Sequence, residues 1–168
     1  SDSPSLYEQL EKNETLSRFF MELLRLYPPI MFQVRKANEA FSIHYTNEIP
    51  IPKGTGLYLS LYHSYRDNRR WEDPTTFNPS RFKQLNSSDT RLQFVNKLNP
   101  FSTGHSKCIG EKFAEMSIKT FICALVQQYK VSPPEGMEPQ NLEVVGKMTL
   151  SFDKDLFVRL EPRQSDII

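Results

Sequence analysis

The residue with the clearest chemical potential is the cysteine at position 108, which lies in the segment FSTGHSKCIG. Cys108 comes at or just before the predicted start of a helix, where unpaired backbone N–H groups and the helix dipole favour a thiolate. Gly104 and Gly110 flank it, and their missing Cβ atoms allow a flat ligand to approach closely. These residues alone are compatible with an ordinary turn cysteine, a redox thiol, or half of a metal site shared with His105.

Zinc is the metal that such a pair first suggests, but a closed zinc site needs four ligands. The chain has two cysteines and three histidines, with no second close pair among them. The other cysteine, Cys123, falls in the middle of an apolar helical segment and is most simply a small core residue. One pair of cysteines does not make a disulfide framework, so a reduced compartment is the better expectation.

A second candidate is the pair formed by Glu22 and Arg25, which are three residues apart in a predicted helix. This spacing allows an ion pair on the side of the helix opposite its apolar face. The ordinary interpretation is a solvated surface contact that contributes little to stability. Taken by itself, the segment therefore predicts a solvated pair.

The bulk composition limits what these motifs can mean. The 168 residues suffice for one domain or for a piece of a larger one. Lys and Arg number 21 against 20 Asp and Glu, so charge gives no reason to expect nucleic acid as a partner. No apolar run approaches the roughly 20 residues that span a bilayer, and SDSPSLYEQL at the start carries no signal pattern. Because the first residue is Ser rather than Met, we expect a fragment.

Two long helices and several short strands are predicted to position these residues. The first helix begins near a cap at Asn13 and ends at Pro28, and its apolar residues recur at helical spacing. Over residues 30–65 the runs FSIHY and GLYLSLY indicate short strands connected as hairpins. Pro50 and Pro52 confine their segment to a sheet edge or a turn.

The middle of the chain, HSYRDNRRWEDPTTFNPSRF, follows neither a helical nor a strand period. We expect an irregular coil held in place by Trp71, Phe77 and Phe82. The polar segment QLNSSDTRLQ after it indicates a surface loop. EKFAEMSIKTFICALVQQYKV, directly after the Cys108 loop, predicts the second long helix, which we expect to be buried because most of its sides are apolar.

Four blocks therefore occur in a fixed order: ELLR in the first helix, FNPSRF after the coil, FSTGHSKCIG, and the long helix that follows. With the spacing of RDNRRWEDPTTFNPSRF, they resemble the C-terminal third of the cytochrome P-450 family over about residues 16–163. The resemblance implies a mainly α fold with a small β component. Its parts would be a helix, short β-hairpins, an irregular meander, a haem-thiolate loop, a long buried helix and a C-terminal β-hairpin. We expect residues 1–168 to form a single unit.

For the loop, the resemblance implies haem binding. Cys108 would be the proximal axial ligand of the haem iron, and thiolate donation to iron favours O–O cleavage. Gly104 and Gly110 would leave room for the haem, while nearby backbone N–H groups would tune the sulfur. Phe101 would pack near the sulfur and exclude water.

Other positions match the family pattern unevenly. The family usually has a basic residue two positions before the cysteine, where it pairs with a haem propionate, and Ser106 stands there without a charge. Arg35 matches another position that commonly holds a propionate. The family also joins Glu22, Arg25 and Arg81 in a network that locks the coil under the haem, because one carboxylate can bind two guanidiniums. No catalytic residue is identified in this span.

The implied activity is that of a haem-thiolate monooxygenase that inserts oxygen into a small apolar organic substrate. Its electrons would come from a reductase or another donor on the proximal face, where Lys97, Lys107 and Lys112 lie near the cysteine in sequence. Ordinary surface lysines are the alternative. FSIHY and VVGKMTLSF would border the substrate pocket. The family's distal helix lies upstream of this span, so we do not expect the 168-residue chain alone to be catalytically competent.

Two other functions stay open. One is a P-450-type isomerase or dehydratase that rearranges peroxides without a reductase, and the other is a truncated non-catalytic product that binds haem weakly or competes for partners. The ending RLYPP of the first helix resembles eukaryotic microsomal members. It implies an endoplasmic-reticulum membrane location for the parent, through an N-terminal part missing from this span, with the mitochondrion as the alternative.

Overall fold

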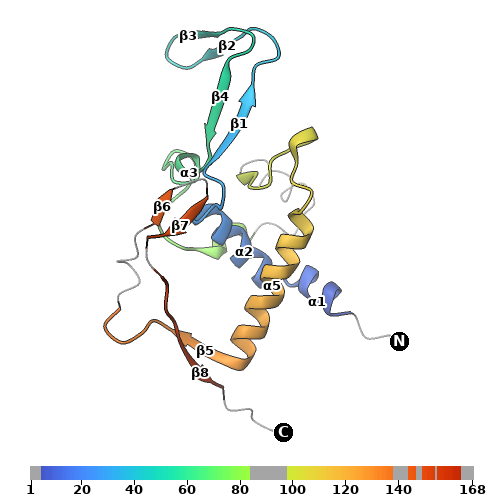
Figure 1. Cartoon of the computed structure of the whole chain (residues 1–168), viewed down its shortest axis with the longest axis vertical. Coiled ribbons are helices and arrows are strands. Elements are labelled where there is room, and N and C mark those ends of the chain that lie inside the picture. The colour runs from blue at the N-terminus through green and yellow to red at the C-terminus, as the bar shows by residue number, and fades with distance from the viewer. Residues whose placement is uncertain (1–4, 84–97, 138–143, 147–148, 154, 164–168) are drawn as a thin grey trace.

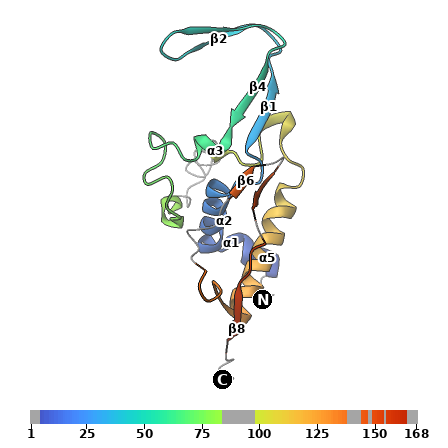
Figure 2. The same ribbon diagram turned by 60° about the vertical axis from the view of Figure 1, so that its left-hand side comes forward.

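The computed structural model describes residues 5–83, 98–137, 144–146, 149–153 and 155–163. Helices α2 (Glu14–Leu26) and α5 (Glu111–Gln128) lie near the centre of an elongated molecule, and the short helix α1 (Leu6–Lys12) contacts both (Figure 1). A long ribbon of strands extends from one end of the molecule. The strand β8 (Arg159–Pro162) lies near the other end, by the C-terminal end of α5 (Figure 2).

Helix α2 forms from a capped, amphipathic segment. The side chain of Asn13 accepts a hydrogen bond from the backbone N–H of Leu16 at 2.9 Å, and the helix ends at Leu26, shortly before Pro28. The helix predicted between Asn13 and Pro28 is therefore confirmed. Its buried side carries both apolar and charged residues, namely Phe20, Glu22, Leu24, Arg25 and Leu26.

The strands that follow α2 make two nested antiparallel pairs. Strand β1 (Phe32–Lys36) pairs with β4 (Gly56–Ser60), and between them β2 (Phe41–His44) pairs with β3 (Glu48–Ile51) as a hairpin. Pro50 lies inside β3, in a two-stranded sheet where each strand is an edge. The nesting lengthens the ribbon, so β2 and β3 lie far from the helices (Figure 1).

The coil predicted after the strands is present, and it ends in the 3₁₀ helix η1 (Pro79–Phe82). Trp71 and Phe82 are buried and meet edge to face, with ring centroids 6.1 Å apart. Phe77 is 39% exposed and contacts Phe19 of α2 at a centroid distance of 5.2 Å. Two of the three aromatic residues expected to hold the coil thus belong to the core, and the third packs on the outside of α2. The predicted loop QLNSSDTRLQ lies outside the described residues.

A small hydrophobic core joins the coil to the chain just before Cys108. Its buried members are Leu61 in the short helix α3 (Leu61–Ser64), Tyr65, Trp71, Phe82 and Leu98. The Tyr65 hydroxyl donates a hydrogen bond to the backbone carbonyl of Leu98. Because Leu98 leads directly into the Cys108 loop, this core sets where that loop begins.

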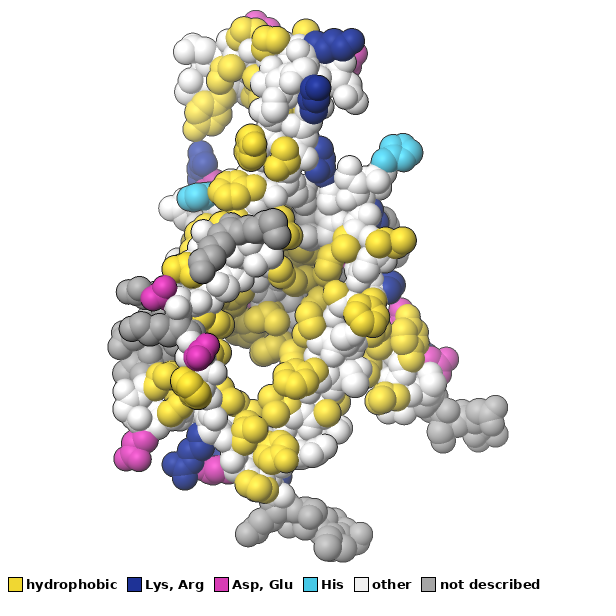
Figure 3. All heavy atoms as spheres, in the orientation of Figure 1, with side chains coloured by type: hydrophobic (Ala, Val, Ile, Leu, Met, Phe, Trp, Pro, Cys, Tyr) yellow, Lys and Arg dark blue, Asp and Glu magenta, His cyan; other side chains and the backbone are white. Residues whose placement is uncertain are grey.

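Helix α5 occupies the predicted residues, but the expectation that it is buried is wrong for this chain. Of its residues only Lys119 is buried, whereas the side chains of Phe113 and Phe121 are 80% and 66% exposed. Cys123 is half-buried rather than a core residue. Within the described part of the chain, helices α1 and α2 contact α5, while Phe113, Phe121 and Val126 stay exposed, and hydrophobic side chains lie open on the face of the molecule shown in Figure 3.

The C-terminal region forms two short antiparallel pairs rather than a single hairpin. Strand β5 (Tyr129–Ser132) pairs with β8, and β6 (Val144–Gly146) pairs with β7 (Leu150–Phe152). The β6–β7 pair lies close to α2, since the backbone N–H of Leu150 donates to the carbonyl of Pro29 at 3.0 Å. None of the helices among the described residues is both long enough and apolar enough to span a bilayer.

The free energy of unfolding should fall at alkaline pH because Tyr65 is buried. Burial raises the pKa of Tyr65 above its ordinary value, because the phenolate form would lose its hydration. The unfolded chain therefore ionises this group first, so the contribution of Tyr65 to stability is complete below about pH 10 and falls as the pH rises further.

We expect the urea midpoint of the wild-type chain to fall more steeply than that of Tyr65→Phe between about pH 9 and about pH 11. Circular dichroism during urea titration measures both. The comparison removes the contribution of the other tyrosines and of the lysines, which the two proteins share. Equal slopes would contradict this role for Tyr65.

Candidate functional site

The Cys108 loop is closed by backbone hydrogen bonds. The N–H of Cys108 donates to the carbonyl of Phe101 at 2.8 Å, and the N–H of Lys107 donates to that of Gly104 at 3.1 Å. A 3₁₀ turn, η2 (Gly104–Ser106), lies inside the loop. Helix α5 begins at Glu111, so Cys108 precedes it by a short turn. These bonds give the cysteine a defined position relative to the start of α5.

Cys108 is a free cysteine in an exposed stretch of the chain that includes large apolar side chains. Cys108 is an exposed free cysteine, Ile109 next to it is fully exposed, and Phe113 projects from the first turns of α5. The two glycines contribute differently. Gly104 has a φ of +61°, which favours glycine, and a Cβ added there would meet nothing within 4 Å. A Cβ at Gly110 would lie in ordinary contact, 3.8 Å from the Cys108 sulfur.

These features fit a haem. A cysteine sulfur is an established axial ligand of haem iron, and it needs an accessible position to bind one. The exposed apolar side chains that follow Cys108 in sequence can pack against a flat apolar ring system, and Gly104 leaves open space on the loop. The described residues around Cys108 therefore offer a ligand atom and an apolar surface together.

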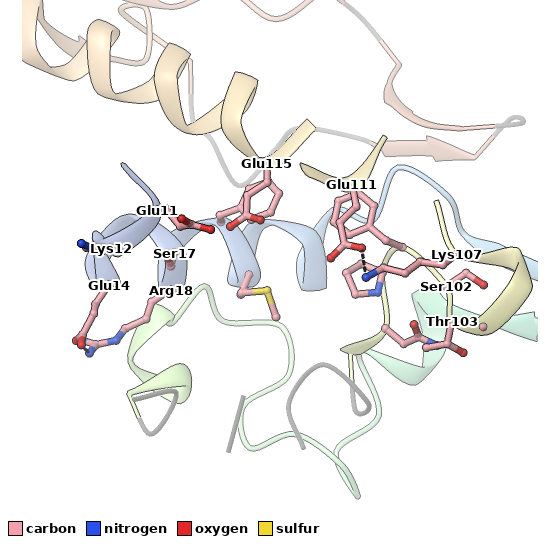
Figure 4. A pocket seen from close by; sticks show the side chains of 16 residues that line it. Glu11, Lys12, Glu14, Ser17, Arg18, Ser102, Thr103, Lys107, Glu111 and Glu115 are labelled. Carbon is pink, nitrogen blue, oxygen red and sulfur yellow. Dashed lines mark hydrogen bonds and ion pairs between the residues drawn. The ribbon is translucent and has the colours of Figure 1, made fainter. Parts of the chain in front are cut away.

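Phe101 connects the loop to α2. Its ring stacks on that of Phe20, with centroids 6.5 Å apart and planes inclined by 21°, and Phe20 is buried. Phe101 also lines a cavity of about 390 Å³ between α2, the loop and the start of α5 (Figure 4). The structure thus brings the backbone of Phe101 to Cys108 and its ring to α2.

The two positions expected near haem propionates lie differently. Arg35 on β1 reaches the Cys108 loop, where its guanidinium donates to the Ser102 hydroxyl, and it also donates to the carbonyl of Val34 at 2.9 Å. Ser106 is exposed within η2. Arg35 is therefore held against the loop and keeps N–H groups that could serve an anionic ligand.

Glu22, Arg25 and Arg81 come together in one network. The Glu22 carboxylate accepts two hydrogen bonds from Arg25, at 2.8 and 2.9 Å, and a third from Nε of Arg81 at 3.0 Å. The side chains of Glu22 and Arg25 have no exposed surface. The interpretation of Glu22 and Arg25 as a solvated pair is therefore wrong, because the coil covers this side of α2.

The network binds the coil through its backbone. Glu22 accepts from the N–H of Asn78 at 2.8 Å, at the start of η1. The guanidinium of Arg25 donates to coil carbonyls, and it also lies over the Trp71 ring with its carbon 5.4 Å from the centroid. Arg81 donates to further carbonyls of the same coil. The carbonyls that accept from these two arginines are those of Tyr65, Glu72, Asp73, Pro74 and Thr76.

Sequence reasoning missed a buried lysine between the two long helices. The Lys119 ammonium in α5 is 2.7 Å from a Glu115 carboxylate oxygen and 2.8 Å from the Ser17 hydroxyl of α2. The spacing of four residues between Glu115 and Lys119 was a signal for an ion pair. Nothing local indicated that the pair would be covered, since Ser17 is far away in sequence.

The described lysines near the cysteine are ion-paired. Lys107 lies 2.8 Å from a carboxylate oxygen of Glu111, and Lys112 lies 3.3 Å from one of Glu11. Lys97, the third lysine considered from the sequence, is outside the described residues. Positive charge on this side of the loop is thus balanced by neighbouring carboxylates.

The sequence matches the cytochrome P-450 family over residues 2–153. The chain belongs to the cytochrome P-450 family. The probable cytochrome P-450 4p3 of Drosophila melanogaster is 29% identical over 156 residues, which cover 93% of this chain and 29% of that protein. The probable cytochrome P-450 4s3 of the same species is 32% identical, covering 90% of this chain and 28% of the relative. Cytochrome P-450 6j1 of Blattella germanica is 29% identical, and the match covers 88% of this chain and 30% of that protein.

Solved structures give the same fold. A crystal structure of a cytochrome P-450 superposes with a TM-score of 0.77 at 24% identity, covering 96% of this chain and 34% of that one. The haem domain of cytochrome P-450DA superposes with a TM-score of 0.77 at 22% identity. The predicted family and fold class are confirmed, and haem is the cofactor of this family. The chain spans less than a third of the length of the relatives named above.

Removing the Glu22 carboxylate should lower the free energy of unfolding of the chain. Glu22→Gln leaves Arg25 buried without a counter-charge, and breaking a buried ion pair in this way costs about 3–5 kcal/mol. We expect that loss in the free energy of unfolding, measured by urea titration. Glu14→Gln is the matched control, because Glu14 also pairs with an arginine on α2 but is 55% exposed. A loss at Glu22 as small as that at Glu14 would contradict the structural importance of this network.

Proposed function

We propose that this chain is the haem-thiolate portion of a cytochrome P-450 monooxygenase, and that Cys108 is its axial ligand. The observation that carries the proposal is the exposed, unpaired thiol of Cys108 on an apolar face at the start of α5. Membership of the cytochrome P-450 family supports it. A haem bound through a thiolate activates molecular oxygen for insertion into organic substrates.

The residues around the thiol would bind and orient the haem. Ile109 and Phe113 would pack against its apolar ring and keep water from the sulfur. Arg35 would donate hydrogen bonds to a haem carboxylate, because its guanidinium already lies against the loop. Phe101, stacked on Phe20, would hold the loop backbone beside the sulfur.

The network of Glu22, Arg25 and Arg81 would act on the site indirectly. It ties the coil to α2, and the coil and Leu98 share one core with Tyr65. Because Leu98 immediately precedes the Cys108 loop, a displaced coil would displace the start of that loop. We therefore assign these three residues a structural role in haem retention.

The parent enzyme would act on a small apolar organic substrate and take its electrons from a reductase or a comparable donor. A donor with an acidic surface would compete with Glu111 and Glu11 for Lys107 and Lys112 on the side of the loop where these ion pairs lie. The endoplasmic-reticulum membrane is the location that we propose for the parent. Turnover would belong to the longer protein, since the chain spans less than a third of its relatives.

Replacing Cys108 tests the ligand directly. Cys108→Ser should abolish the red-shifted Soret band of the reduced carbon monoxide complex, because that band requires a thiolate on iron. Cys123→Ser is the matched control, since it removes the other thiol from the same helix region and should leave the band in place. Absorption spectra of haem-reconstituted protein measure both.

The spectra should be recorded for the 168-residue chain and for the full-length parent. A defined thiolate spectrum in both would support haem binding by this portion alone. A thiolate spectrum only in the parent would assign stable binding to the longer protein. A band that persists in Cys108→Ser would overturn the assignment of the ligand.

A further inference from the structure

The segment that leads to Cys108 is strained. Asn99 and Ser102 have φ angles of 39° and 63°, in the left-handed region that residues with a Cβ atom rarely adopt. Such conformations persist where the surrounding structure holds them in place. Two of the three non-glycine residues with positive φ among the described residues fall in this short segment.

Packing gives the segment little support on one side. Residues 99–104 line the cavity of about 390 Å³, and Phe20 and Met21 of α2 line it as well. Atoms that face a cavity have no contacting neighbours there. The stack of Phe101 on Phe20 is a contact on this side, and it is made by the residue between the two strained ones.

Two side chains of strand β1 hydrogen-bond to the strained residues. The side-chain amide of Gln33 donates to the backbone carbonyl of Asn99 at 3.0 Å, and the guanidinium of Arg35 donates to the Ser102 hydroxyl. Gln33 and Arg35 are two residues apart on the strand, so their side chains leave the same face. Gln33 is only 9% exposed, although its side chain is polar.

Gln33 acts at the point where the strained turn closes. The carbonyl of Asn99 that accepts from Gln33 also accepts from the N–H of Ser102 at 3.3 Å. The amide oxygen of Gln33 lies 3.5 Å from a guanidinium nitrogen of Arg35, which orients Arg35 toward the loop. From this turn the constraint passes to the cysteine, because Cys108 donates its N–H to Phe101 within the same segment.

We propose that Gln33 is a positioning residue of the haem site: its hydrogen bond to Asn99 fixes the strained turn, and thereby the backbone of Cys108, before haem binds. An effect of Gln33 on haem binding rests on the proposed role of Cys108 as the ligand. Its effect on the backbone of the loop does not depend on that role. Ser106 has no charge and therefore cannot restrain the loop through an ion pair with a haem carboxylate. The hydrogen bond of Gln33 restrains the loop from within the protein instead.

The test uses Gln33→Leu, which keeps a similar side-chain volume and removes the donor. Hydrogen exchange of the Cys108 backbone N–H, followed by NMR in the haem-free chain, should become about fivefold faster, the effect of one ordinary hydrogen bond on a local opening. Val34→Thr is the matched control, because Val34 is the next residue on β1 and its side chain is 57% exposed. It should leave the exchange rate unchanged.

Amides of α2 report whether the variant keeps its fold. If Gln33→Leu speeds exchange in α2 as well, Gln33→Glu replaces it, because a carboxylate keeps the polarity of the side chain but cannot donate to the Asn99 carbonyl. Faster exchange at Cys108 with unchanged exchange in α2 supports the positioning role. Unchanged exchange at Cys108 in a folded variant overturns it.

Haem titration separates this inference from the proposed ligand. With haem, Gln33→Leu should need about fivefold more haem for half-saturation and should give a smaller fraction of thiolate-ligated spectrum. If neither wild type nor variant forms a thiolate complex but exchange at Cys108 still accelerates, the positioning of the loop stands and the ligand assignment fails. A variant that binds haem as wild type does, with exchange unchanged, overturns the positioning role and leaves Cys108 as the ligand.

Discussion

The burial of the Glu22 carboxylate between two guanidiniums is the interaction on which the middle of this structure depends. A charged group without exposed surface is stable only when its hydrogen-bonding capacity is met, and here Arg25, Arg81 and the N–H of Asn78 meet it. The N–H groups of the two arginines that do not contact Glu22 donate to carbonyls of the coil. Arginines of α2 and η1 thus donate to carbonyls of the irregular coil and hold it against α2.

Helix α2 consequently supports two parts of the site at once. On one side it carries the network that holds the coil, and on another Phe20 packs against Phe101 of the Cys108 loop. Leu98, just before that loop, shares one core with Trp71 and Phe82 of the coil, and Tyr65 donates a hydrogen bond to its backbone carbonyl. The position of the thiol therefore depends on α2 by two routes, one through the core and one through the loop itself.

The exposed apolar face around Cys108 is the feature that connects fold and function. In a chain that spans less than a third of its relatives, apolar side chains of α5 lie uncovered beside a free thiol. Exposed apolar patches of this kind mark binding surfaces. Under the proposed function a haem would bind the thiol and cover the apolar surface around it, and the family to which the chain belongs uses haem.

The sequence by itself determined the features that depend on neighbours along the chain. The cap at Asn13 and the stop at Pro28 bounded α2, the glycines located the turn before α5, and the order of four motifs indicated the family. The tertiary structure alone decided which side chains are covered. A spacing of three residues does not distinguish a solvated Glu22–Arg25 pair from a buried one, because the groups that bury it lie 40 or more residues away. For the same reason Gln33 gave no signal, since its partner Asn99 is remote in sequence. Helix α5 was expected to be buried because an apolar pattern shows that a helix can pack against other elements, but it does not show which elements cover it.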